Sequence, residues 1–158
     1  MSKNTKKQLL QKLIEKMEEK EKEISVQIER NRQGVIESPG RMQSRYDSMK
    51  QELSYLVDSL CKRLGDLKKE ILNLKKFSSD EAISNKVELG AVVEVESNKD
   101  KKVFFMLPAG AGETVRDKEL GEITILNFAS PLGKSLFGKV VDEEITVAAK
   151  KYLITKIT

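Results

Sequence analysis

The residues that could carry chemistry are few, and they do not form a self-sufficient catalytic set. The chain has no histidine, so neither a Ser/His/Asp nor a Cys/His arrangement is possible. Asp142, Glu143 and Glu144 are ligands of the kind that a hard cation takes, but three adjacent acids ahead of a strand favour a solvated turn. The single cysteine, Cys61, falls within a helical pattern and is interpreted as a small apolar filler. We therefore expect no enzyme, with no catalytic residue, no cofactor and no metal.

Two glycine-containing stretches resemble phosphate-binding loops only in their letters. Residues 108–112 read Pro-Ala-Gly-Ala-Gly, but they lack a Gly-Lys-Ser/Thr ending and a long helix after it. Residues 133–135 read Gly-Lys-Ser, but no strand and glycine turn lead into them. The first stretch is predicted to be a turn, and the second is predicted to lie on a helix surface.

The triplet Ser38-Pro39-Gly40 divides two long, charged, helix-patterned segments. Proline disfavours helix in the residue before it, and glycine opens backbone conformations that other residues avoid, so the triplet predicts the bend of a helical hairpin at residues 37–41. The side chains predicted to form the tip of this hairpin are Glu37, Ser38, Pro39, Gly40, Arg41, Met42, Arg45, Tyr46 and Asp47. Arg41, Arg45 and Lys50 give this tip a positive bias.

Both arms of the predicted hairpin carry an apolar stripe at helical spacing. In the first arm the stripe is interrupted, and its members are Leu10, Leu13, Met17, Ile24, Ile28 and Val35. In the second arm the pattern is closer to a heptad repeat, with members Met49, Leu53, Leu56, Leu60, Leu64, Leu67, Ile71 and Leu74. An antiparallel coiled coil accounts for both patterns. Folding the chain about residue 39 predicts the pairs Val35 with Gln43, Ile28 with Met49, Ile24 with Leu53, Met17 with Leu60 and Leu13 with Leu64.

The second half of the chain changes period and predicts four or five short strands of a small antiparallel sheet. The apolar segments lie at residues 87–95, 103–107, 123–126, 145–147 and 152–157, with turn signals at residues 97–100, 108–112 and 148–151. A short helix is predicted from Pro131, with Ser130 as its N-cap, Gly138 as its stop, and Leu132, Leu136 and Phe137 on one face. The predicted fold class is α+β, with a coiled-coil hairpin at 1–76, a linker at 77–85 and a C-terminal domain at 86–158.

Composition narrows the class of protein. The 158 residues are 39% hydrophobic, 34% charged and only 5% aromatic, which leaves little material for a large core. Residues 1–76 hold 18 Lys and Arg against 12 Asp and Glu, so the hairpin is mildly basic. No apolar run is long enough to cross a membrane, the first ten residues lack a signal-peptide core, and the lone cysteine agrees with a reducing compartment. We expect a soluble cytoplasmic protein, a monomer, without a membrane partner.

The layout resembles the bacterial GreA/GreB transcription elongation factors. The resemblance is most specific at the segment with Ser130, Pro131, Leu132, Gly133 and Lys134 and at Arg45-Tyr46-Asp47. It implies an FKBP-like C-terminal domain without isomerase activity, which grips the β′ subunit of RNA polymerase at the rim of the secondary channel while the coiled coil reaches down that channel. Carried over by position, Ser130 and Pro131 belong to the polymerase-docking edge, and Leu132 supports or shares it. Ala129 departs from the acidic residue that some members have.

The tip departs from the family pattern in a way that matters for activity. Members that stimulate transcript cleavage carry an Asp and a Glu three residues apart, which help to hold a second Mg²⁺ in the polymerase's own active site. Aligning Tyr46 with the family's tyrosine position places Pro39 and Met42 where these acids belong, and neither can bind Mg²⁺. The expected function is therefore modulation of elongation or initiation without efficient cleavage, with the basic tip able to contact RNA or nucleotide phosphates.

Three alternatives remain open at this stage. The first is a transcript cleavage factor that uses Glu37 or Asp47, which flank the bend. The second is a hairpin that binds nucleic acid directly through its lysines, although stacking aromatics beyond Tyr46 and Tyr55 are absent. The third is a coiled-coil scaffold that does not act on polymerase.

Overall fold

The computed structural model describes the backbone of residues 3–37, 43–77 and 84–158, and the side chains of residues 4–34, 47–77 and 84–158. The chain divides into two compact units. One contains residues 16–70, and the other contains residues 1–15 together with residues 71–158. The predicted boundaries at 76 and 86 stay a prediction.

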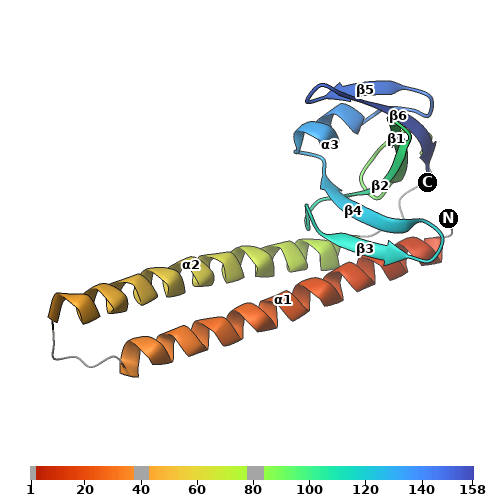
Figure 1. The fold of residues 1–158 in the computed structure, drawn as a ribbon. Coiled ribbons are helices and arrows are strands. Elements are labelled where there is room, and N and C mark those ends of the chain that lie inside the picture. Colours follow the sequence, from red (N-terminus) through yellow and green to blue (C-terminus); the bar gives the residue numbers. More distant parts are fainter. Residues whose placement is uncertain (1–2, 38–42, 78–83) are drawn as a thin grey trace. The chain divides into compact units, whose positions relative to one another are not determined.

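Two long helices form the first half of the chain, α1 at Lys3–Glu37 and α2 at Gln43–Lys76 (Figure 1). Within residues 16–70 they run antiparallel, because Glu21 pairs with Lys68 at 3.9 Å while Arg32, further along α1, contacts Cys61, which comes earlier in α2. Ile24, Ile28 and Val57 are buried between the helices. Four further α2 side chains pack against them: Leu60, Cys61, Leu64 and Leu67.

The register of this hairpin differs from the predicted one. The backbone of Gly34 faces Leu53, whose Cδ1 lies 3.7 Å from the position of an added Cβ, whereas the prediction placed Ile24 beside Leu53. This difference of ten residues is about three helical turns. The prediction took residue 39 as the centre of the fold, whereas the midpoint between Gly34 and Leu53 is near residue 43. The predicted stripe was also partly wrong, because Val57 is buried while the predicted members Met49 and Leu56 are 53% and 45% exposed. The true stripe runs through Leu53, Val57, Leu60, Leu64 and Leu67, which alternates steps of four and three as a coiled-coil seam requires.

The register leaves the start of α2 beyond the end of α1. Three residues after Gly34 is Glu37, the last residue of α1, and three residues before Leu53 is Lys50. Residues 43–49 of α2 therefore extend past the end of α1 (Figure 1). At helical rise these seven residues are about 10 Å long. Among the described residues, the first two turns of α2 form the far end of the hairpin.

A six-stranded sheet forms the second half of the chain. The strands are β1 at Val92–Ser97, β2 at Asp100–Leu107, β3 at Thr114–Asp117, β4 at Gly121–Asn127, β5 at Glu144–Val147 and β6 at Lys150–Ile157. Their order across the sheet is β3-β4-β2-β1-β6-β5. The predicted α+β class is confirmed, and the neighbouring pairs are antiparallel except β2 and β4, which are parallel. This one parallel pair, and strand β3, are absent from the prediction.

The turn sequences account for most strand boundaries. Asn98 and Lys99, between β1 and β2, both adopt positive φ, as do Ala148 and Ala149 between β5 and β6. Two consecutive residues with positive φ are the mark of the two-residue hairpin turns that match strand twist. The predicted strand at residues 87–95 begins only at Val92, since Gly90 has a φ of 87° and the Ala91 N–H donates to the Glu88 carbonyl in a turn.

A short helix, α3 at Pro131–Leu136, packs on one face of the sheet. Leu136 is fully buried in a cluster with sheet side chains that include Val93, Phe104 and Ile154, and Leu132 packs against the same cluster. Phe137 was predicted on this face but is 49% exposed, because the helix ends at Leu136 and the backbone changes direction there.

The ends of the two long helices belong to the same compact unit as the sheet. In this unit Leu13 and Leu74 are fully buried, so the predicted stripes continue there as core, and Leu9, which the predicted stripe did not include, is fully buried with them. Lys12 Nζ donates to the carbonyl of Arg116 in β3 at 3.4 Å.

Candidate functional site

The segment that enters α3 carries the residues predicted to dock on a partner, and its backbone is held by a capping hydrogen bond. The Gly133 N–H donates to Ser130 Oγ at 3.0 Å, and the same hydroxyl donates to the Asn127 carbonyl at 2.7 Å. Ser130 is thus the predicted N-cap, and Pro131 occupies the first helical position. Pro131 is exposed, whereas Leu132 is partly buried against the core.

Asn127 is a residue of this segment that sequence reasoning missed. Its Oδ1 accepts a hydrogen bond from the Ala129 N–H at 2.8 Å, and its Nδ2 donates to the carbonyl of Pro108 at 3.4 Å. An asparagine that bonds the backbone two residues ahead forms an Asx turn. An asparagine three residues before a Ser-Pro helix start is the signal that could have identified it.

Gly133 is the second residue that was missed. A Cβ added there would lie 2.1 Å from the Asn127 carbonyl oxygen and 2.9 Å from Phe128 Cα. The first turn of α3 therefore sits directly on the end of β4, and only glycine fits between them. The sequence places the same residue in Gly-Lys-Ser, where its role as a packing contact cannot be read.

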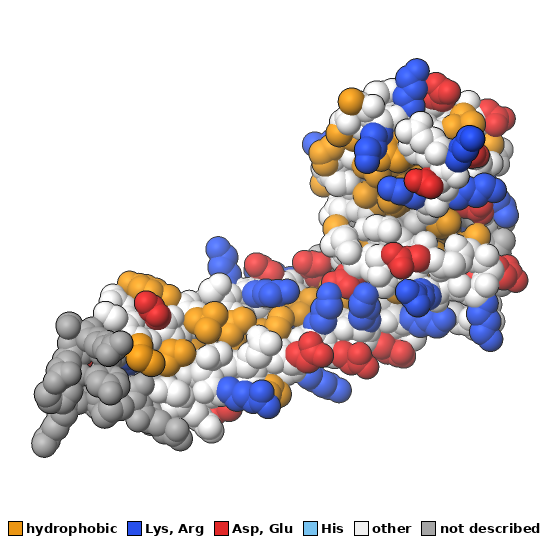
Figure 2. All heavy atoms as spheres, in the orientation of Figure 1, with side chains coloured by type: hydrophobic (Ala, Val, Ile, Leu, Met, Phe, Trp, Pro, Cys, Tyr) orange, Lys and Arg blue, Asp and Glu red, His pale blue; other side chains and the backbone are white. Residues whose placement is uncertain are grey.

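Exposed apolar side chains lie on both sides of α3 in the chain. Phe128 and Phe137 are each almost half exposed, and Val140 and Val141 are exposed as well. Figure 2 shows hydrophobic side chains at the surface on the side of the β domain that carries α3. Large exposed apolar side chains gathered in one region are typical of an interaction surface.

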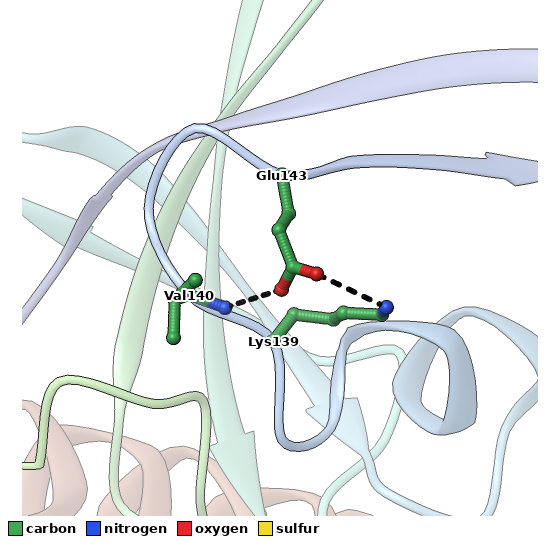
Figure 3. Close-up of polar contacts among 3 residues, drawn as sticks. All are labelled: Lys139, Val140 and Glu143. Carbon is green, nitrogen blue, oxygen red and sulfur yellow. Dashed lines mark hydrogen bonds and ion pairs between the residues drawn. The ribbon is translucent and has the colours of Figure 1, made fainter.

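A charged turn follows α3 and fixes the segment at Val140. Glu143 Oε2 accepts from the Val140 N–H at 2.8 Å, and Glu143 Oε1 lies 3.3 Å from Lys139 Nζ (Figure 3). The hydrogen bond from Val140, aided by the Lys139 ammonium, holds the pKa of the Glu143 carboxyl below its ordinary value. Glu143 therefore acts as a structural acid in a turn. Within the described side chains, no three His, Cys, Asp or Glu gather as they would to hold a metal.

Most of the predicted tip lies outside the described residues. These are Ser38, Pro39, Gly40, Arg41 and Met42, together with the side chains of Glu37, Arg45 and Tyr46. Asp47 is described and is exposed on α2. It lines a shallow groove along one face of that helix with Lys50, Gln51, Ser54, Tyr55 and Asp58. Gln51 Nε2 donates to Tyr55 Oη at 3.2 Å within this groove.

Cys61 lies on α2 and packs between the two helices of the hairpin. Its side chain packs against the Ile24, Ile28 and Val57 cluster, and Arg32 Nη2 donates to its Sγ at 3.7 Å. The position agrees with the apolar filler interpretation. Among the described helices, none is both long and apolar enough to cross a membrane.

No family model matches the sequence. Curated relatives do match: the transcription elongation factors GreA of Sphingopyxis alaskensis and of Zymomonas mobilis are each 31% identical over 98 residues. The matched stretch is 60% of this chain and 58% of each relative, so the chain spans under two thirds of the length of these relatives.

Solved structures with some likeness are those of Gfh1, a GreA factor homolog. The Gfh1 of Thermus thermophilus is 18% identical, with 97% of this chain and 94% of that chain covered and a TM-score of 0.37. The Gfh1 of Thermus aquaticus is 19% identical, with 94% and 90% covered and a TM-score of 0.35. Because these TM-scores are low, the fold described above rests on the contacts within this chain and not on the likeness to Gfh1. The match to the two GreA proteins confirms the resemblance drawn from the sequence: over 98 residues this chain is similar to GreA elongation factors.

Proposed function

We propose that this protein is a transcription factor that binds bacterial RNA polymerase and inserts its helical hairpin into the secondary channel. The observation that carries the proposal is the 98-residue match to two GreA elongation factors. In this proposal the C-terminal domain docks on the β′ rim of the channel, and the hairpin modulates elongation or initiation. The protein contributes no catalytic residue of its own, and it acts as a cytoplasmic monomer.

The segment at Ser130, Pro131 and Leu132 is proposed as the docking edge. Pro131 is exposed at the first position of α3, and Phe128 beside it is almost half exposed. A rigid, partly apolar edge suits a protein partner, since a fixed backbone loses little conformational entropy on binding. Leu132 mainly supports the docking edge from the inside, because its side chain packs against the domain core.

The far end of the hairpin is proposed to promote transcript cleavage poorly. Mg²⁺ takes oxygen ligands in near-octahedral geometry, and a pair of converging carboxylates is the usual protein contribution. Asp47 lies on the part of α2 that extends past α1, but the residue one turn further on the same face is Lys50. An ammonium beside a carboxylate competes with a cation for it. The tip is accordingly proposed to contact acidic groups, nucleotide phosphates or RNA.

A backtracked elongation complex tests the activity. We expect the protein to bind the complex and to leave the transcript at full length in the presence of Mg²⁺. Rapid shortening of the transcript would contradict the claim and favour the second candidate, a cleavage factor that uses Glu37 or Asp47. Replacing each acid by its amide would then identify the one responsible.

Co-purification tests the docking edge. RNA polymerase is expected to be retained by the wild-type protein and lost when Pro131 and Leu132 are both replaced by alanine. Thr155→Ala, which changes an exposed residue of β6, is the matched control. Retention by the double variant would contradict the proposed edge. Steeply salt-dependent binding to naked RNA or DNA, with no binding to polymerase, would favour a nucleic-acid-binding hairpin instead.

A further inference from the structure

The loop between β4 and α3 is tied to the end of a different strand by one side chain. Asn127 is the last residue of β4, and its parallel neighbour in β2 is Leu107. The residue after Leu107 is Pro108, whose carbonyl accepts from Asn127 Nδ2 at 3.4 Å. The other end of the same amide, Oδ1, accepts from the Ala129 N–H at 2.8 Å. The Asn127 amide therefore joins the β2 end to the loop that leads into α3.

The main chain of Asn127 fixes the other half of this loop. Its carbonyl accepts from Ser130 twice, from the backbone N–H at 3.1 Å and from Oγ at 2.7 Å. The same carbonyl leaves no room for a side chain at Gly133. The loop residues Phe128, Ala129 and Ser130 are thus spanned by hydrogen bonds that all end on Asn127.

The hydrogen bonds to Asn127 also fix the side chains that the loop at residues 128–131 exposes to solvent. Phe128 and Pro131 are exposed, while Asn127 itself is only partly exposed. We propose that Asn127 is a positioning residue for the docking edge: its side-chain amide holds residues 128–131 in the conformation that a partner recognises, without itself contributing the exposed contact surface. This inference rests on the proposed function of the edge.

The two hydrogen bonds of the amide are unequal, and this gives the test its design. The Ala129 contact is short, while the Pro108 contact is near the limit of hydrogen-bond distance. Asn127→Asp keeps the acceptor for Ala129 and loses only the donor to Pro108. Asn127→Ala loses both. Asn127→Ser keeps a hydroxyl that can make the same turn more weakly.

The experiment measures the affinity of each full-length variant for bacterial core RNA polymerase, together with its thermal midpoint. We expect Asn127→Ala to weaken binding about fivefold, the loss of one ordinary hydrogen bond, and Asn127→Asp to bind within about twofold of wild type. Thr155→Ala is the matched control, because Thr155 Oγ1 donates to the Glu94 carbonyl at 3.1 Å and so loses one side-chain to backbone bond elsewhere on the sheet. It is expected to bind as wild type.

Equal binding by wild type and Asn127→Ala would overturn the inference. A loss of affinity in Asn127→Asp or in Thr155→Ala as large as that in Asn127→Ala would also overturn it. Both of these variants keep the hydrogen bond to the Ala129 N–H, so the loss could not then be caused by breaking that bond. If Asn127→Ala does not fold, Asn127→Ser replaces it. Asn127→Ser is expected to bind polymerase more weakly than Asn127→Asp but still measurably. An affinity of Asn127→Ser equal to that of wild type would overturn the inference. Failure of the wild-type protein to bind polymerase would instead refute the proposed function itself.

Discussion

The segment around α3 and the exposed half of α2 differ in what fixes their side chains. In residues 127–133 the backbone is set by hydrogen bonds to Asn127 and Ser130 and by the close approach of Gly133. In residues 47–58 the helix backbone places the side chains, and the groove they line is open along one helix face. One region is determined by contacts within a few residues, and the other by how two distant helices are aligned.

This difference decides which of the two regions can be predicted from the sequence. A capping serine, a proline after it and a glycine beyond are recognised from three adjacent letters. The face of α2 that meets α1 depends on which of two overlapping apolar series is buried, and the series through Leu56 and the series through Val57 both have helical spacing. The alignment of the two helices along their axes depends on where the chain turns, which neither series shows.

The largest effect is expected from Gly133→Ala, which attacks the locally determined region. The added Cβ would lie 2.1 Å from the Asn127 carbonyl oxygen, so α3 must move away from β4. We expect a loss of about 3 kcal/mol in the free energy of unfolding of the β domain, measured in urea by circular dichroism. Gly65→Ala is the matched control: nothing lies within 4 Å of its added Cβ, and alanine favours helix, so it should gain about 1 kcal/mol. Equal stability of Gly133→Ala and wild type would mean that the contact at α3 is not rigid.

A pair of neighbouring substitutions sharpens the description of the hairpin. Val57→Ala removes a buried side chain from the Ile24 and Ile28 cluster and should cost about 1 to 2 kcal/mol, whereas Leu56→Ala should change stability by less than about 0.5 kcal/mol. Urea unfolding of the two variants measures this. The reverse order of effects would contradict the burial of Val57 and favour the predicted stripe through Leu56.

A smaller gain is expected at the turn between β5 and β6. Ala149 has a φ of 63°, a conformation that a Cβ disfavours and glycine adopts freely. Ala149→Gly should therefore raise the free energy of unfolding by about 1 kcal/mol. Ala129→Gly, in the loop before α3, is the comparison, since Ala129 is not among the residues with positive φ and should gain nothing. A loss of stability in Ala149→Gly would argue against the left-handed turn.

The smallest effect is a pH dependence of the turn at Glu143. The pKa of this carboxyl is held below its ordinary value of 4.5, chiefly by the Val140 N–H, so its stabilising effect is present above that pH and is lost as the pH falls through the lowered folded value. The pKa of Asp117 is lowered too, chiefly by the Glu119 N–H, and contributes in the same direction. Glu143→Gln keeps an acceptor for Val140 but not the charge. Its thermal midpoint should fall below that of wild type at about pH 7 and approach it at about pH 3. A difference that grows as the pH falls would have the wrong sign for a lowered pKa.

Much of the fold was predictable from the sequence. The two helices, the Ser130 cap, the hairpin turns at Asn98 and Ala148 and most of the strands follow from local patterns. Strand β3 was missed because its four residues contain one apolar side chain, Val115. The parallel pairing of β2 with β4 was missed because it joins strands that are not consecutive.

The candidate site was predictable only in its outline. Ser130 and Pro131 are visible in the sequence as a helix start, but Asn127 and Gly133 have roles that depend on a carbonyl brought close by the fold. The spacing predicts that Phe137 continues the buried face of α3, but Phe137 is exposed because the helix stops one residue earlier. For Asn127 and Gly133, the sequence alone does not show which backbone atoms of other elements lie close to them.

The close seating of Gly133 on the end of β4 restricts how this edge could be re-engineered. A side chain at position 133 would collide with the Asn127 carbonyl, so the main chain there tolerates little redesign. A changed binding preference at the proposed docking edge would therefore have to come from outward side chains such as Phe128 and Pro131, which can be substituted one at a time.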